Sequence, residues 1–489
     1  MTNGQGEFSR RSILGMGAAG IAGAAAPAFA HSGAGHRGHS QRLLVRGGTV
    51  LTMDPGVPDM MQGDVLIKNG KIEAVGPHLS AHGAHVIDAR GKIVMPGFVD
   101  THRHMWQGLI RNSGPNAQLL DYLNTVLFGF APAITPDEVY TGNLVTALSA
   151  ANAGITTMLD WSHIASSPEH SDAAIEGLES AGVRAVYAYG PSFGKQPPWF
   201  EDLDNPYPGD IYRLADEYFS SSDQLLTLAL AAAGPEFSNV DAAEIEWNVA
   251  RDVGVPITTH VGVGAPGANG LLAELASRVG LGDDTTYIHA CTLSDFEFQL
   301  IADSGGKISL AVPVEMQMGH GIPPIQRSLD YGIRPSLSVD VETNQPTDMF
   351  TQMRACFALQ RGLLNADNLF PEMGHVPQLL TVRDVLEFAT IEGARTNGLG
   401  SKVGSLTPGK QADFILLNAR ALNVAPMNDP VGAVVLGMDT SNVESVFVEG
   451  RPLKWQGKMV GVNVDRLLDR AEAMRLALYA RAGIPLPGV

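Results

Sequence analysis

The sequence is poor in cysteine, in charge and in long apolar runs. Its 489 residues include two cysteines, Cys291 and Cys356, which are too few for a disulfide framework or a thiolate metal site. A single bridge between them and two buried free thiols both remain open. Beyond residue 30 there is no run of about 18 apolar residues, so no membrane span is expected in the mature chain.

Positive charge is also scarce. Lysine and arginine number 33 against 51 aspartates and glutamates, which gives a net charge of −18. An acidic chain without basic patches repels nucleic acid and anionic lipid, so neither is expected as a partner. We expect a small-molecule substrate instead.

The N-terminus has the features of an export signal. Two arginines, Arg10 and Arg11, precede a Gly/Ala-rich apolar stretch that ends in Ala28-Phe29-Ala30. This resembles a twin-arginine signal over residues 1–30 with an A-x-A cleavage site, and it predicts a periplasmic or extracellular protein. A membrane anchor is the alternative, but the stretch is short and weakly apolar. Residues 31–41 are polar and Gly-rich, which predicts a flexible tether.

Both flanks of the remaining chain are typical of β structure. Residues 42–96 contain a hairpin pattern in which Asn69-Gly70 joins two alternating runs. Residues 400–464 contain further β-rich runs, among them Val443–Gly450. The two flanks are predicted to pair into one small β-sandwich, and residues 465–489 to form a C-terminal helix and tail.

Between the flanks, residues 97–399 alternate short apolar runs with amphipathic stretches. This alternation predicts parallel βα units, and eight runs are what a (β/α)8 barrel requires. The predicted barrel strands are Phe98–Asp100, Ile155–Asp160, Arg184–Tyr189, Leu225–Ala232, Ile257–His260, Thr286–His289, Lys307–Ala311 and Arg334–Val339.

Metal-binding residue types stand at the ends of four of these runs. His102 and His104 follow the first run, and their i, i+2 spacing puts both imidazoles on one face of a strand. His260 ends the fifth run, His289 ends the sixth, and Asp340 follows the eighth. Barrel enzymes carry their catalytic groups at this end of the strands, so the five side chains are expected to converge.

Neutral imidazoles together with one carboxylate suit Zn²⁺ or a similar divalent ion. Such an ion lowers the pKa of bound water toward neutrality. A carboxylate such as Asp340 can take the proton of that water and pass it to the leaving group.

Three segments resemble the amidohydrolase superfamily. They are Pro96–His104, Gly154–Asp160 and Gly404–Phe414. The residues after the eighth strand resemble the branch of cytosine, guanine and adenosine-type deaminases and triazine hydrolases; they are Asp340, Asn344, Asp348, Met349, Phe350 and Met353. Relatives are often dimers or larger, so a homo-oligomer is possible.

The resemblance implies one divalent metal, zinc or alternatively iron, held by His102, His104, His260 and Asp340, with His289 contacting the hydroxide or substrate. Two-metal members usually carry a lysine on the fourth strand, and the run Leu225–Glu236 has none. One metal is therefore favoured, and a second ion bridged by Glu236 is the minority alternative.

One departure from the branch concerns the proton donor. Its deaminases generally carry a glutamate three residues after the fifth-strand histidine, where this chain has Val263. Another group must supply the proton, or the reaction does not need it. The candidates are Glu236, Glu315, Glu342 and His320. His163 is expected to contact the substrate, and Trp106 and Gln107 to line the pocket.

These observations predict a metal-dependent hydrolase that acts on non-peptide carbon–nitrogen bonds of a cyclic or aromatic small molecule. The missing glutamate leaves hydrolysis of a urea, a carbamate, an amide or a carbon–halogen bond open. A two-metal amidase is the rival within the class. A non-catalytic relative that binds without turnover is the rival outside it.

Overall fold

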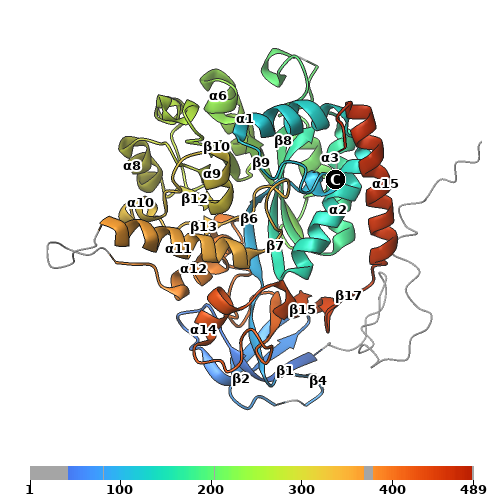
Figure 1. The fold of residues 1–489 in the computed structure, drawn as a ribbon, viewed down its shortest axis with the longest axis vertical. Helices are drawn as coiled ribbons and strands as arrows, with labels where there is room; N and C mark the ends of the chain where they lie inside the picture. The colour runs from blue at the N-terminus through green and yellow to red at the C-terminus, as the bar shows by residue number, and fades with distance from the viewer. Residues whose placement is uncertain (1–41, 81, 203, 368–377, 487–489) are drawn as a thin grey trace, which may run out of the picture.

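The computed structural model describes residues 42–80, 82–202, 204–367 and 378–486. The predicted export signal and tether, residues 1–41, lie outside the described residues. The described chain forms a large barrel and a smaller β-sheet unit below it (Figure 1). No helix among the described residues is both long and apolar enough to cross a membrane.

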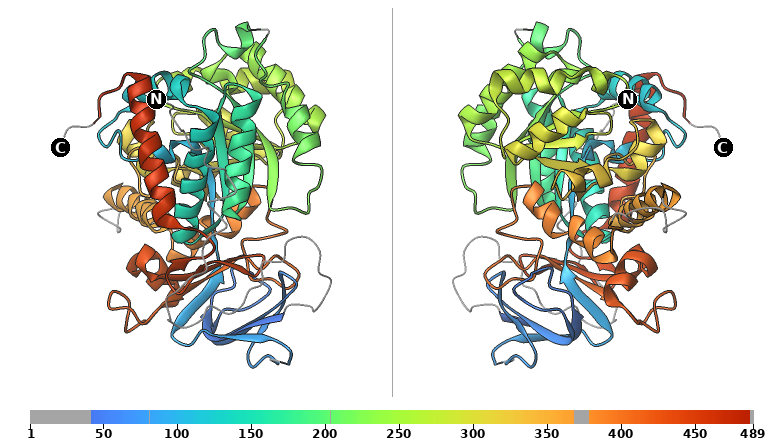
Figure 2. Two further views of the ribbon diagram at one scale, coloured as in Figure 1. Left: turned by 90° about the vertical axis from the view of Figure 1, so that its right-hand side faces the viewer. Right: turned by 90° about the vertical axis from the view of Figure 1, so that its left-hand side faces the viewer.

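Eight parallel strands form the barrel, as predicted, and each predicted run overlaps one of them. In chain order they are β6 (Phe98–Arg103), β7 (Ile155–Ala165), β8 (Arg184–Pro191), β9 (Leu226–Ala232), β10 (Ile257–Val261), β11 (Thr285–His289), β12 (Lys307–Leu310) and β13 (Ser336–Leu337). The longer helices lie outside them: α2 (Pro136–Asn152), α3 (Pro168–Ala181), α6 (Val240–Val253), α7 (Leu271–Val279), α8 (Asp295–Ser304) and α11 (Met349–Asp367). Figure 2 shows these helices surrounding the strands.

The last seam of the barrel closes just beyond β13. The Asp340 amide donates to the His102 carbonyl at 2.9 Å, and the His104 amide donates to the Asp340 carbonyl at 2.9 Å. The first and eighth strand segments are therefore joined at the residues that were predicted to bind metal.

The two chain flanks pair, as predicted, but their hydrogen bonds form one continuous mixed sheet. Its strands run β17-β16-β15-β14-β5-β1-β2-β3, and β4 pairs with β1. β14 (Phe414–Asn418) from the C-terminal flank lies antiparallel to β5 (Lys92–Pro96) from the N-terminal flank. The remaining strands are β1 (Arg42–Val50), β2 (Met60–Lys68), β3 (Lys71–Gly76), β4 (His85–Asp88), β15 (Val443–Val448), β16 (Arg451–Trp455) and β17 (Lys458–Met459).

Buried polar contacts join the sheet to the barrel. Arg184, at the start of β8, forms a buried ion pair with Asp413 at 2.7 Å. The final helix, α15 (Val464–Ala482), then runs along the outside of the barrel (Figure 2). Its Tyr479 packs edge-on against Phe130, with ring centroids 4.7 Å apart.

Candidate metal centre and its cavity

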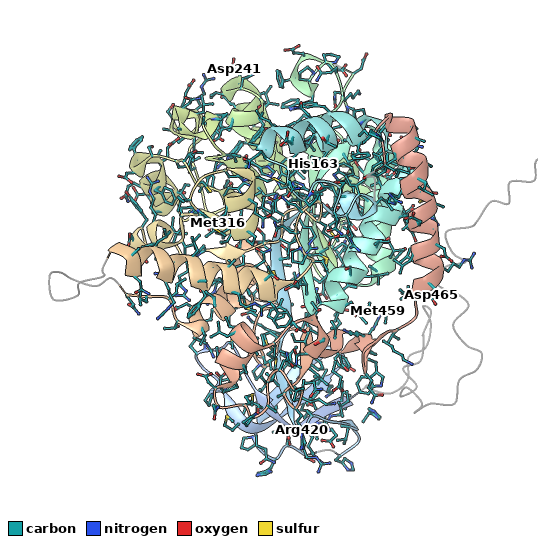
Figure 3. The ribbon with its side chains drawn as sticks, viewed as in Figure 1. His163, Asp241, Met316, Arg420, Met459 and Asp465 are labelled. Atoms are coloured by element: carbon teal, nitrogen blue, oxygen red, sulfur yellow. The ribbon has the colours of Figure 1, made fainter. Side chains whose placement is uncertain are left out.

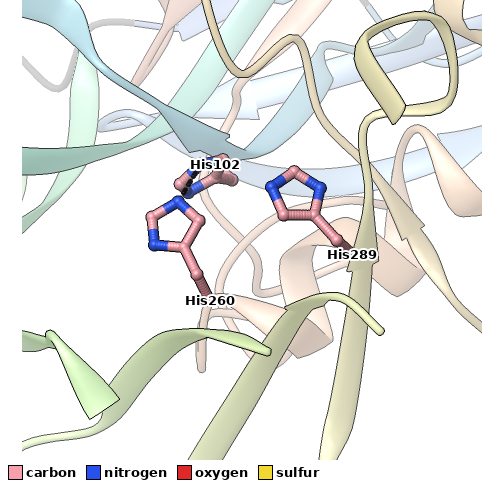
Figure 4. A group of neighbouring side chains, drawn as sticks. All are labelled: His102, His260 and His289. Carbon is pink, nitrogen blue, oxygen red and sulfur yellow. Dashed lines mark hydrogen bonds between the residues drawn. The ribbon is translucent and has the colours of Figure 1, made fainter. Parts of the chain in front are cut away.

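The five predicted side chains converge at the C-terminal ends of the barrel strands. Asp340 Oδ1 lies 3.2 Å from His102 Nε2 and 3.3 Å from His104 Nε2. His260 Nε2 lies 3.1 Å from His102 Nε2, and His289 Nε2 lies 3.7 Å from Asp340 Oδ2. Figure 4 shows the rings of His102 and His260 in contact and the ring of His289 beside them.

The atoms that face one another fit a bound cation. His104 Nδ1 lies 2.8 Å from the Trp161 carbonyl, which can only accept, so this nitrogen carries the proton. The Nε2 lone pair of His104 therefore points at the Asp340 carboxylate, and two acceptors at this distance repel unless a cation lies between them. Two ligands on a tetrahedral zinc ion lie about 3.3 Å apart, which matches the spacings found here.

Burial keeps the imidazoles in the neutral form that binds metal. It lowers the pKa of His102 to about 3 and the pKa of His260 well below its usual value. Burial likewise lowers the pKa of His289 to about 4. These groups therefore keep their lone pairs across the physiological range.

His289 and Asp340 sit on backbone that side chains rarely adopt. Their φ angles are +72° and +67°. A residue other than glycine in this region is uncommon and is held there by its surroundings. For Asp340 the two backbone hydrogen bonds at the barrel seam supply that constraint. For His289, Glu315 Oε1 lies 3.1 Å from ring Nδ1 and fixes the ring.

A buried charge network braces the strand that carries the H-x-H pair. Arg103 Nε donates to Asp100 at 2.8 Å, and Arg103 Nη1 donates to Glu342 at 2.6 Å. Arg111 also bonds Glu342. Although burial acts in the opposite direction, Arg111 and Arg103 hold the pKa of Glu342 below its usual value. Glu342, a predicted candidate for the proton donor, is therefore a paired carboxylate that ties β6 to the loop after β13.

A cavity opens above this cluster of histidines and Asp340, and most of its walls are apolar. Its lining residues are His104, Leu119, Tyr122, Leu123, Leu127, His163, Phe193, Phe237, His260, Val263, His289, Met318, His320, Asp340 and Val341. Asp340 is the one carboxylate among these described lining residues. The cavity measures ≈ 50 Å³, whereas one water takes about 10–15 Å³ on the same measure. A ring-sized substrate therefore requires the walls to move apart.

Of the seven residues predicted to donate the proton, contact the substrate or line the pocket, two line this cavity, namely His163 and His320. Figure 3 places His163 in the interior of the barrel unit. Both ring nitrogens of His320 are buried without a partner among the described residues. The His320 ring lies 4.6 Å from that of His289, centroid to centroid.

The expectation that Trp106 and Gln107 line the pocket is corrected, because both are buried behind its wall. Glu236 and Glu315 also lie outside the lining. Glu236 accepts hydrogen bonds from the backbone amides of Gly262 and Val263, at 2.6 and 3.3 Å. Burial raises the pKa of Glu236 to about 7 and that of Glu315 to about 8. Glu236 therefore acts on the site through the backbone of Gly262 and Val263, and Glu315 acts on it through the ring of His289.

Tyr122 is the polar lining residue that sequence reasoning missed. It ends α1 (Leu119–Tyr122), and its hydroxyl lies 2.7 Å from Gln107 Nε2 and 3.4 Å from His163 Nε2. No sequence motif marks this tyrosine, because it lies where α1 passes into the next helical segment, Leu123–Phe130, among neighbours that are mainly apolar.

The two cysteines are free thiols. Cys291 is partly buried and Cys356 is buried. Of the two alternatives left open by the sequence, the structure has the unbridged one.

A barrel with imidazoles and a carboxylate converging at its strand ends defines a metal-dependent hydrolase of the barrel class. The sequence model of the amidohydrolase family matches residues 93–453. This chain belongs to the amidohydrolase family. The predicted membership and enzyme class, hydrolases acting on carbon–nitrogen bonds, are confirmed, as is a divalent metal as cofactor.

Known proteins resemble the chain over most of its length. The 5'-deoxyadenosine deaminase of Methanosarcina barkeri is 26% identical, and the match covers 90% of this chain and 99% of that protein. A zinc-bound adenosine deaminase from Xanthomonas campestris has a TM-score of 0.77 at 22% identity, covering 90% and 98% of the two chains. A zinc-bound atrazine chlorohydrolase from Arthrobacter aurescens has a TM-score of 0.77 at 24% identity, covering 88% and 100%. At these identities the solved structures establish the shared fold.

Proposed function

We propose that this protein is a zinc hydrolase that displaces an amino group from a carbon atom of a neutral nitrogen heterocycle. The observation that carries the proposal is the juxtaposition of the His/Asp cluster with a largely apolar cavity above it. The names of the relatives support the reaction type, since they include adenosine-type deaminases.

A zinc ion would be held by His102, His104, His260 and Asp340, and there it would lower the pKa of water toward neutrality. Asp340 lies beside this position and takes the proton of the attacking water. It then hands the proton to the departing nitrogen, which leaves with the electron pair of the broken bond. The ring of His289 is fixed by Glu315, and its Nε2 contacts the hydroxide or the substrate in the cavity.

The walls favour a flat and largely uncharged substrate. Leu119, Leu123 and Leu127 line the cavity from one stretch of the chain, and Phe193 and Phe237 line it from two others. Apolar walls with a few convergent polar groups are typical of small-molecule sites. No lysine or arginine stands among the described lining residues, so a substrate that carries phosphate or carboxylate would lack a counter-charge.

Val263 favours a second candidate, the loss of halide rather than amine. It lines the cavity where deaminases of this branch carry the proton-donating glutamate. Halide is a weak base and departs without a proton, so this reaction makes no demand on a missing acid. The resemblance to an atrazine chlorohydrolase supports this candidate.

One assay separates the candidates. The full-length protein, loaded with zinc or with iron, is incubated with paired amino- and chloro-substituted triazines, purines and pyrimidines, with and without a chelator. Ammonia release that is lost on chelation and restored best by zinc supports the proposal. Chloride release alone supports the second candidate. Release of neither product from the whole panel refutes both.

We also propose that the protein is exported by the twin-arginine route, on the strength of Arg10, Arg11 and the Ala28-Phe29-Ala30 cleavage pattern. Cell fractionation tests this proposal. The wild-type chain is expected in the exported fraction, and a double variant, Arg10→Lys with Arg11→Lys, is expected to remain inside the cell. Equal distribution of the two forms would refute it.

A further inference from the structure

We infer that the hydroxyl of Tyr122 is the hydrogen-bond donor that replaces the acid missing at position 263. It donates to the ring nitrogen beside the carbon under attack. This inference rests on the proposed function, since it assigns a residue to that reaction.

The first link fixes the protonation of His163. The indole nitrogen of Trp106 lies 2.9 Å from His163 Nδ1, and an indole N–H can only donate. His163 Nδ1 must therefore be the acceptor and carry no proton. A neutral imidazole then has its proton on Nε2, which faces the Tyr122 hydroxyl at 3.4 Å.

The second link fixes the phenol. His163 Nε2–H donates toward the Tyr122 oxygen from one side, and Gln107 Nε2 donates to it at 2.7 Å from another. A hydroxyl oxygen has two acceptor positions and one proton. Because donors fill both acceptor positions, the O–H of Tyr122 is free to donate a hydrogen bond to another group.

The remaining direction is the cavity. Tyr122 lines it together with Asp340 and His289, and the side chain is otherwise buried. Burial raises the pKa of Tyr122 well above its ordinary value, so the phenol keeps its proton throughout the working pH range. A buried donor with a fixed direction and no partner of its own is arranged to meet a ligand.

This arrangement supplies what an aromatic displacement needs. As the water oxygen bonds to the ring carbon, an electron pair moves onto the adjacent ring nitrogen. Tyr122 stabilises that charge by a hydrogen bond and keeps its own proton. The pair returns as the bond to the leaving group breaks, and the proton held by Asp340 departs with the leaving nitrogen. No proton beyond that of the water is required.

His163 acts here as a positioning residue. It stacks on the metal ligand His104 with ring centroids 3.8 Å apart and an interplanar angle of 5°. Its ring is therefore set by the metal centre on one face and by Trp106 at its edge. The phenol is thereby held in register with the metal position.

The principal test replaces Tyr122 by phenylalanine, which removes the hydroxyl and keeps the ring. Loss of one preorganised donor lowers kcat by about 10²–10³-fold, with KM nearly unchanged because the interaction forms in the transition state. Tyr140→Phe is the matched control, since Tyr140 is also buried and its hydroxyl donates to Ser180 at 3.1 Å, on the outer helices. This control is expected to keep wild-type kcat.

A second pair of variants tests the positioning role. His163→Gln keeps one acceptor for Trp106 and one donor for Tyr122, so it is expected to retain more turnover than His163→Leu, which keeps neither. Equal losses in the two variants would mean that the ring fills space and orients nothing. A kcat for Tyr122→Phe within about threefold of wild type, or a larger loss in His320→Asn than in Tyr122→Phe, would overturn the assignment to Tyr122.

A third measurement needs no substrate. Nitrogen-15 spectra of histidine-labelled protein, with His163 assigned by the His163→Gln variant, report which ring nitrogen carries the proton. We expect the proton on Nε2. A proton on Nδ1 would overturn the chain of hydrogen bonds from Trp106 through His163 to Tyr122. If the substrate panel yields no turnover while the Nε2 proton is found, the proposed reaction has failed and this chain of hydrogen bonds stands.

Discussion

The cavity has a floor, the cluster of His102, His104, His260, His289 and Asp340, and walls that are mainly apolar. The floor and the walls are built in different ways. The floor takes its side chains from β6, β10, β11 and the residue that closes the barrel after β13, and backbone hydrogen bonds of the barrel fix their positions. One wall comes from α1 and from η3 (Leu123–Phe130), an eight-residue π-helix. Such helices are rare and are frequently found at functional sites.

This difference separates two kinds of information. The floor sets the class of reaction, because it carries the proposed metal ligands and the proposed proton carrier. The wall sets which molecule reaches the floor, because it sets shape and polarity. A change in the wall can therefore alter the substrate while the chemistry persists, in line with the way barrel enzymes vary their loops.

The largest effect is expected from removing part of the floor. The double variant His102→Ala with His104→Ala loses two of the four proposed metal ligands and is expected to lose both bound metal and turnover. Metal content is measured by elemental analysis after loading and dialysis. His170→Ala is the control, since its ring bonds the Ile134 carbonyl outside the cavity. Unchanged stoichiometry in the double variant would place the metal elsewhere.

Asp340→Asn sharpens the comparison by keeping the shape of the floor and removing its proposed proton carrier. Turnover is expected to fall by about 10²–10⁴-fold, even in protein that still holds metal. Steady-state kinetics on metal-loaded samples provide the measurement. Asp348→Asn, in the same loop but outside the lining, serves as the control. Substantial residual turnover in Asp340→Asn would refute its assigned role.

A change in the wall is expected to act on binding. Leu127 lines the cavity, and its neighbour Phe128 is 52% exposed. Leu127→Ala removes apolar contact with the substrate and is expected to raise KM by about tenfold with little change in kcat. Phe128→Ala is expected to change neither constant. A fall in kcat at constant KM would show that this wall takes part in the chemistry.

The smallest effect on turnover is expected at Glu246, which acts on stability. Its carboxylate accepts hydrogen bonds from the backbone amides of Ala233 and Gly234, where the segment that carries Phe237 begins. Burial raises the pKa of Glu246 from 4.5 to about 7, so folding favours the protonated form. Its stabilising contribution is complete below the unfolded pKa and is lost as pH rises through about 7, by about 3 kcal/mol.

Urea unfolding between about pH 5 and about pH 8 measures this contribution. Wild type is expected to lose stability across the range relative to Glu246→Gln, which has no titrating group at this position. Parallel pH profiles in the two proteins would show that Glu246 is ionised throughout. Activity serves as the internal check and is expected to differ little between them.

The floor could be predicted because residue chemistry and strand periodicity coincide there. An H-x-H pair and single histidines directly after apolar runs predict convergence at one barrel end, and His102, His104 and His260 do converge. The wall offered no such coincidence. Leu119, Leu123 and Leu127 have the spacing of any buried helix face, so the sequence did not show that they face a cavity.

The errors have a common physical cause. Trp106 and Gln107 follow the H-x-H pair in sequence, and proximity along the chain suggested that they line the pocket. The backbone turns into η2 (Met105–Leu109) directly after the strand, which buries both side chains behind the wall. Tyr122 arrives from a separate segment, and its role depends on direction of hydrogen bonding, which residue identity alone does not encode.

The seam that closes the barrel has a consequence for how strongly this protein resists local unfolding and proteolysis. The amides of His104 and Asp340 are shielded by the same residues whose side chains would grip the ion. Without a bound ion, the His104 imidazole and the Asp340 carboxylate would repel each other at this seam, so local unfolding would begin there. Protease resistance and slow amide exchange at the seam would then report metal occupancy in a cell extract, without any assay of catalysis.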